Sequence, residues 1–267
     1  MRKDEKRSGV AAWAGVAGVA TMMGVAWWVD ASRRSEEARI THRILVDVLL
    51  NALTADDAIT ARHSRRVADL SFALAEQSGM SLRERATLRV AALLHDMGKI
   101  DDRFFHIVHS RDPLSEAERA EMEFHPHLSA RILEPLEPIH PGLTAIVASH
   151  HECWDGTGYP CGCAGEEIPL GARIVAVADV FDAMTQPRAY KEGMPVAEAF
   201  ERLRQSAGRQ FDPRLVDLVH AYPVREQWQE IACNGQLDEK REQAAALNAP
   251  PATHANPPKL EDGPPQA

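Results

Sequence analysis

The chain has 267 residues, of which 45% are hydrophobic and 26% are charged, and its formal net charge is −9 at pH 7. This size and composition fit one packed domain with attachments at its ends. The negative charge excludes general binding of DNA or RNA, which needs a basic face, but it is compatible with a small anion held by a few local cations. The four cysteines contain no C-x-x-C pair, so a zinc ribbon is not indicated and reduced thiols are expected.

The first segment with a clear pattern is the apolar run 9–29, which holds 21 residues without a charge. A run of this length can cross a bilayer as one helix. Trp13, Trp27 and Trp28 lie near its ends, where indole rings favour the membrane interface. We therefore predict a single transmembrane helix that anchors the chain through residues 1–30. A cleaved signal peptide is the competing interpretation, and the equal numbers of basic residues on the two sides of the run do not decide its orientation.

The following residues repeat apolar side chains at helical spacing. Residues 31–53 are expected to form a connecting helix with an apolar stripe at Ile40, Ile44, Val48, Leu49 and Ala52. A second helix carries a stripe from Ile59 to Leu74 and stops at Gly79. Ser81 and Ser115 are each followed by a glutamate three residues later, the capping-box pattern that begins a helix.

The rest of the domain continues the helical pattern. A short helix is expected at 143–150, and the run 168–184 is apolar nearly all round, as in a buried helix. Its valine-rich part could also pass for a buried strand, but the length and alanine content of the run favour a helix. Two closing helices are expected at about 196–205 and 213–221. The prediction is an all-α domain over 54–225.

Residues 226–267 are expected to form a C-terminal extension. From about residue 243 the chain is rich in proline and alanine and lacks periodic apolar residues. Such a composition cannot bury enough apolar surface to fold, so this part is predicted to be a disordered tail.

Several histidines and carboxylates fall on the apolar faces of the expected helices. A single histidine on such a face is more often an ordinary core residue, but three on separate helices favour a shared role. A carboxylate inside an apolar helix is costly unless it is paired or binds a cation. Imidazoles and carboxylates that converge in a bundle core are typical metal ligands, and a set without sulfur suits iron, manganese or zinc. The residues placed by this argument are His63, His95, Asp96, His150, His151 and Asp179.

Five short motifs then occur in a characteristic order. They are HSRRV at 63–67, HDMGK at 95–99, HP at 125–126, HHECWDGTGYP at 150–160 and VADVFDAM at 177–184. With these motifs, the chain from about Thr54 to Leu218 closely resembles the HD-GYP family of the HD phosphohydrolase superfamily. Members of that family are mostly phosphodiesterases that hydrolyse the bacterial second messenger cyclic di-GMP.

The resemblance implies a helical bundle of the HD superfamily that holds two divalent metal ions, with iron or manganese expected. Asp96 would bridge the two ions. Some family members carry a glutamate ligand for a third metal where this chain has Ile59, which favours two ions here. The implied metal ligands are His63, His95, Asp96, His125, His150, His151 and Asp179.

The resemblance also implies four contacts to the substrate. Lys99 would contact the phosphate and stabilise the charge that develops on it; without the family, it is equally well a lysine at the C-terminus of a helix. Arg188 and Lys191 would supply further cations, and Tyr159 would offer its ring and hydroxyl to a guanine unless it is an ordinary packed tyrosine.

The implied reaction is hydrolysis of cyclic di-GMP to linear pGpG, with further cleavage to GMP left open, by attack of a metal-bridging hydroxide. Two alternatives remain: a non-catalytic cyclic-dinucleotide sensor or interaction module, and a phosphohydrolase for another nucleotide such as cyclic GMP-AMP. Because the family substrates are cytoplasmic, we expect a single-pass protein of the bacterial inner membrane with its domain in the cytoplasm. Two kinds of protein partner are left open: a second copy of the chain, which would form a homodimer, and other signalling proteins.

The loop after the paired histidines has further features. Gly156 and Gly158 are expected to permit positive φ angles. Cys161 and Cys163 lie where the family varies and are expected to be structural, or else to make the loop redox-sensitive. Outside this loop, Ser129 stands where the family usually has a glycine.

Overall fold

The computed structural model describes residues 58–101, 103–104, 107, 114–187 and 192–247, together with isolated positions between 40 and 48. The predicted anchor at 1–30, most of the connecting helix and the tail beyond 247 lie outside the described residues. So do two predicted substrate contacts, Arg188 and Lys191. Among the described residues, no helix is both long and apolar enough to cross a membrane.

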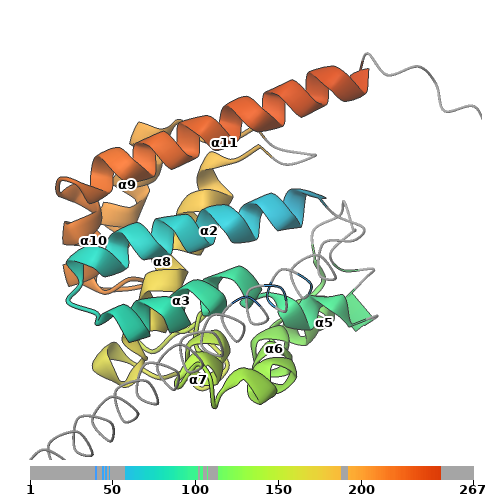
Figure 1. The fold of residues 1–267 in the computed structure, drawn as a ribbon, viewed down its shortest axis with the longest axis vertical. Helices are drawn as coiled ribbons and strands as arrows, with labels where there is room; N and C mark the ends of the chain where they lie inside the picture. The colour runs from blue at the N-terminus through green and yellow to red at the C-terminus, as the bar shows by residue number, and fades with distance from the viewer. Residues whose placement is uncertain are drawn as a thin grey trace, which may run out of the picture.

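The described part of the chain consists of helices and contains no β-strand, which confirms the predicted fold class (Figure 1). Three short 3-10 helices connect the longer elements, namely η1 (Met97–Ile100), η2 (Glu134–Leu136) and η3 (Gly165–Glu167). The α-helices are α2 (Ala58–Gln77), α3 (Leu82–Leu94), α5 (Glu116–Met122), α6 (His125–Leu133), α7 (Leu143–Ala148), α8 (Leu170–Thr185), α9 (Val196–Gln205), α10 (Pro213–His220) and α11 (Val224–Leu247).

Helix α2 occupies the centre of the bundle. It packs against α3, α8 and α11, and Figure 1 shows α3 and α11 on opposite sides of it. Helices α6 and α7 pack against each other, and α7 also contacts α3 and α8. Helix α8 is buried along most of its length, including Ile174, Val177 and Phe181, so the predicted buried helix is confirmed and the strand alternative is wrong.

The predicted helix starts at Ser81 and Ser115 are confirmed. The Ser81 backbone N–H donates to the Glu84 carboxylate (2.7 Å), and the Glu84 N–H donates to the Ser81 hydroxyl (3.3 Å). Ser115 and Glu118 repeat this arrangement at the start of α5. The capping box at Ser81 fixes the start of α3, and His95 directly follows the last residue of this helix.

Two helices were not predicted. Helix α6 begins at His125, and Pro126 lies in its first turn, where a missing N–H costs no hydrogen bond. Helix α11 extends well past the predicted domain end at 225 and includes 243–247 of the predicted disordered tail. Its Trp228 is fully buried and donates its indole N–H to the Leu70 carbonyl (3.0 Å). The packed core therefore extends beyond residue 225.

The connecting helix also differs from its predicted packing. Its described positions are helical, but Ile40, Ile44 and Val48 are each more than half exposed, whereas Val46 is 6% exposed. The predicted stripe is therefore not the face that this segment turns toward the core.

Candidate metal centre

All seven predicted ligands converge from five parts of the chain that are far apart in the sequence. They form two neighbouring groups, and within each group the possible ligand atoms lie within 4.8 Å of one another. We call them the Asp96 group and the His63 group. The Asp96 group is Asp96 before η1, His125 at the start of α6, and His150 and His151 after α7; the His63 group is His63 in α2, His95 after α3 and Asp179 in α8.

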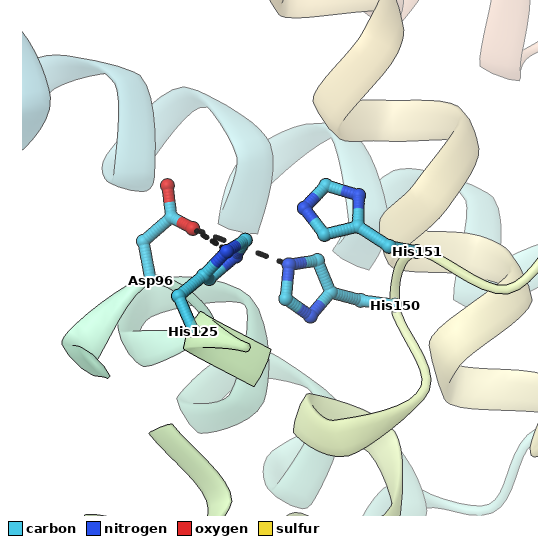
Figure 2. Close-up of side chains that lie close together, drawn as sticks. All are labelled: Asp96, His125, His150 and His151. Carbon is cyan, nitrogen blue, oxygen red and sulfur yellow. Dashed lines mark ion pairs between the residues drawn. The ribbon is translucent and has the colours of Figure 1, made fainter. Parts of the chain in front are cut away.

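The Asp96 carboxylate stands between the two groups. Its Oδ1 lies 3.2 Å from Nε2 of His125 and 4.0 Å from Nε2 of His150, the two contacts drawn in Figure 2. Its Oδ2 lies 3.4 Å from Nε2 of His95 and 2.8 Å from Nζ of Lys99. One oxygen therefore faces each group, which is the arrangement that a bridging carboxylate requires.

The His63 group is supported by Asp182, a carboxylate that is not among the predicted ligands. His63 Nε2 lies 3.2 Å from Asp179, and its Nδ1 lies 2.7 Å from Asp182. Arg66 donates two hydrogen bonds to the same Asp182, at 2.6 and 3.1 Å. The available signal was the position of Asp182, three residues after Asp179 in a mostly apolar helix.

The three fully buried histidines of the two groups share one orientation. In His95, His125 and His150, Nδ1 lies 2.6–2.9 Å from the carbonyl oxygen three residues earlier. An Nδ1–H that donates to this carbonyl leaves Nε2 with a free lone pair. These three Nε2 atoms and Asp96 Oδ1 are buried and have no hydrogen-bond partner. Unpartnered buried polar atoms are rare, and here they are all acceptors that point into the groups, so this donor set fits cations.

Asp96, His150 and His151 are in the protonation states that metal ligands need. Burial would raise the pKa of Asp96, but Lys99 and the nearby imidazoles outweigh it and hold that pKa well below its usual range. Burial lowers the pKa of His150 far below its usual value and the pKa of His151 to about 4. At neutral pH the carboxylate is therefore ionised and both rings are neutral, as metal ligands must be.

His63 behaves differently because two carboxylates flank it. Burial alone would lower its pKa, but hydrogen bonds and charge interactions with Asp179 and Asp182 raise it to about 10. Asp179 attracts positive charge to Nε2 of His63, and a cation held by His63 and Asp179 would take the place of the proton.

Close packing between η1 and α6 sets the distance between Asp96 and His125. A Cβ at Gly98 would lie 2.5 Å from the His125 carbonyl oxygen and 2.8 Å from the Ser129 nitrogen. The Gly98 N–H donates to the buried Ser129 hydroxyl (2.7 Å). Ser129, which stands where the HD-GYP family usually has a glycine, therefore links η1 to α6.

We expect Gly98→Ala to destabilise the protein by about 1–3 kcal/mol, the usual cost of overpacking. The new methyl group meets backbone atoms, so α6 must move away and carry His125 with it. Chemical denaturation measures the stability, and metal titration should show a parallel loss of affinity. A variant with unchanged stability and metal affinity would contradict this account of the packing.

A cavity of about 200 Å³ opens beside the two groups. Its lining includes His150, His151 and Asp179 together with Tyr159 from the following loop, and the Tyr159 ring centroid lies 4.9 Å from that of His151. Tyr159 therefore lies beside the candidate ligands, and its contact with a substrate stays a prediction. The volume is below the roughly 300–1,000 Å³ of typical small-molecule sites, so it suits part of a ligand such as one phosphate.

The two loop glycines have different roles. Gly156 adopts a φ of +81°, as expected. Gly158 does not have a positive φ, so that part of the prediction was wrong. It is needed for close approach instead, because a Cβ there would collide with the backbone of Glu152 and Cys153.

The profile of the HD domain family matches residues 47–215 of this chain. Three curated proteins are similar to it. A cyclic di-GMP phosphodiesterase response regulator of Xanthomonas campestris is 41% identical over 64% of this chain and 45% of its own length. A cyclic di-GMP phosphodiesterase of Thermotoga maritima is 40% identical over 63% and 46%. A 3'3'-cGAMP-specific phosphodiesterase of Vibrio cholerae is 37% identical over 68% and 35%.

These matches confirm the resemblance to HD proteins. The chain spans less than half the length of each of these relatives. The region matched by the HD domain profile, 47–215, contains both groups, so this match covers the candidate centre.

Proposed function

Because this chain belongs to the HD domain family, we propose that it is a metal-dependent phosphodiesterase that hydrolyses cyclic di-GMP to linear pGpG. The observation that carries the proposal is the set of buried acceptors without partners, Nε2 of three histidines and Oδ1 of Asp96, in two groups that share one carboxylate. The relatives named for cyclic-dinucleotide hydrolysis support this choice of substrate.

We propose that the Asp96 group and the His63 group each hold one divalent cation, iron or manganese, with Asp96 as the ligand common to both. When bound, the cations acidify water and neutralise charge on the phosphate. The residues of the chain do the rest. The buried imidazoles of His95, His125 and His150 keep Nε2 directed inward, and the apolar helices around them exclude bulk water. Tyr159 closes one wall of the cavity.

Lys99 is proposed to stabilise the phosphate during the reaction. Its ammonium lies 2.8 Å from Asp96 Oδ2 and is partly exposed, so it stands at the edge of the centre with access to a ligand. Arg188 and Lys191 are proposed as further substrate contacts on the basis of the family resemblance.

We expect Lys99→Met to lower kcat by about 10²-fold, the usual cost of removing one charge-stabilising donor. Metal content should not change, because Lys99 is not a ligand. Initial rates and bound metal per chain measure the two effects. The control is Arg103→Met, which removes a half-exposed cation nearby that pairs with Asp101. Equal effects of the two substitutions would contradict the role of Lys99.

A second candidate is hydrolysis of a cyclic GMP-AMP dinucleotide, favoured by the similarity to the Vibrio cholerae enzyme. Both substrates present a phosphodiester to the same centre, so the bases must decide between them. A non-catalytic sensor is less well supported, because it would have no need of a complete ligand set.

The test is to purify the full chain in detergent under anaerobic conditions, to count its bound metal and to incubate it with a panel of cyclic dinucleotides. Chromatography should show linear pGpG from cyclic di-GMP and a loss of turnover after chelation. Preferential cleavage of cyclic GMP-AMP would establish the second candidate. Full metal content with tight nucleotide binding and no cleavage would overturn the enzyme and favour a sensor.

We also propose that residues 9–29 anchor the chain in the bacterial inner membrane with the domain in the cytoplasm. The support is the length of the uncharged run and the cytoplasmic location of the proposed substrate. A C-terminal reporter that is active only in the periplasm would overturn this orientation.

A further inference from the structure

The loop after the paired histidines contains a third cluster of possible ligands, which the proposed reaction does not use. Glu152 directly follows His151, and Cys161 and Cys163 lie at the other end of the loop. One carboxylate oxygen and the two Sγ atoms all lie within 4.8 Å of one another. Glu152 is 3% exposed, Cys163 is partly exposed and Cys161 is exposed.

The Glu152 carboxylate is only half satisfied. Its Oε1 accepts a hydrogen bond from the Cys161 backbone N–H (2.7 Å), which holds the two ends of the loop together. Its Oε2 is also buried but has no hydrogen-bond partner. A buried carboxylate oxygen without a partner is costly, and the two neighbouring thiols carry no positive charge that could offset it. A cation would.

The chemistry of the cluster differs from that of the Asp96 and His63 groups. Those groups offer only nitrogen and oxygen, whereas this cluster offers two sulfurs and one oxygen. Two thiolates with a third protein ligand suit a borderline cation such as Zn²⁺, which binds sulfur at about 2.3 Å and carboxylate oxygen at about 2.0–2.2 Å in tetrahedral geometry. The ligand atoms must approach one another slightly, and the exposed Cys161 side chain is free to rotate. A water molecule can complete the set from the solvent side.

We propose that Glu152, Cys161 and Cys163 form a zinc site that is separate from the two groups of the main centre. An ion there ties the end of the loop to the residue that follows His151. The enclosed segment carries Tyr159, which lines the cavity. Zinc would therefore hold one wall of the cavity in place.

The test uses the reduced full chain titrated with Co²⁺. Cobalt bound to thiolate has a ligand-to-metal charge-transfer band in the near ultraviolet, and cobalt in the sulfur-free groups does not, so the band distinguishes a thiolate site from the Asp96 and His63 groups. We expect the band to appear and to be abolished by Zn²⁺. The readout requires no phosphodiesterase activity, so it can fail or succeed independently of the proposed function.

Matched variants complete the experiment. Cys161→Ser and Cys163→Ser, singly and together, should weaken or abolish the band, while Cys153→Ser and Cys233→Ser should retain it. Glu152→Gln should lower the Co²⁺ affinity by roughly 10–100-fold or more. Loss of an outer-shell partner already has an effect of that size, and Glu152 is proposed as a direct ligand. Circular dichroism checks that each variant is folded. Absence of the band in protein with all thiols reduced, its survival in the double variant, or an unchanged affinity in Glu152→Gln would each overturn the proposed site.

Discussion

Asp96→Asn is expected to lower the rate of cyclic-dinucleotide hydrolysis by about 10³-fold and to reduce the metal content of the protein. The carboxylate presents Oδ1 to His125 and His150 and Oδ2 to His95 and Lys99, all within 4.0 Å. Asparagine has the same shape but no charge, and its amide offers only one oxygen. One of the two groups therefore loses its shared ligand.

The loss should be separable from unfolding. Asparagine leaves no cavity at this buried position, and Lys99, the cation that pairs with Asp96, is partly exposed and can be solvated by water when the charge is removed. Bound metal per chain and initial rates are the measurements, with thermal unfolding as the check. Asp69→Asn is the matched control, since Asp69 is half exposed and pairs with Arg89 on the surface. If Asp96→Asn kept full metal content and the original rate, the centre described above would be wrong.

Asp182→Asn is expected to lower metal affinity by about 10–100-fold, although Asp182 is not itself a proposed ligand. Asp182 is 2% exposed and accepts hydrogen bonds from Arg66 while it contacts His63 Nδ1. It is a positioning residue, because it fixes the ring of His63 so that Nε2 faces Asp179. The amide can present its NH₂ group to His63 and so favour the wrong tautomer.

The same substitution should destabilise the protein by about 3 kcal/mol, because it breaks a buried ion pair from one side. A control is needed for this second effect. Thr185→Val in the same helix removes a buried hydroxyl that donates to the Phe181 carbonyl, but the hydroxyl does not contact His63. Metal titration and urea denaturation of both variants separate the effects. Equal metal affinities in the two variants would show that Asp182 has only a structural role.

The local signals in the sequence determined the elements on which the centre is built. The capping boxes at Ser81 and Ser115 depend only on residues three positions apart, and both form as predicted. The apolar run of α8 determined a buried helix, and within such a helix Asp179 had to have a partner. The histidines on apolar stripes, with their neighbours Asp96 and His151 and the carboxylate of Asp179 in an apolar helix, account for six of the seven residues found in the two groups. The family resemblance supplied His125.

Other features depend on contacts between distant parts of the chain, and only the tertiary structure could decide them. Trp228 lies in a segment with many polar residues, so its burial could not be read from the sequence. It is buried because α11 packs on α2, where the Leu70 carbonyl accepts the hydrogen bond of its indole. Asp182 acquires its role from Arg66 and His63, more than a hundred positions earlier.

The same reason applies to the glycines and to the cysteine cluster. A sequence marks glycine as permissive, but only the packing distinguishes the positive φ of Gly156 from the close approach at Gly158. From the sequence, Cys161 and Cys163 were expected to be structural or to make the loop redox-sensitive, and no partner for them was evident. Their proximity to the buried Glu152 follows from how that loop closes, because a hydrogen bond across nine residues brings its ends together.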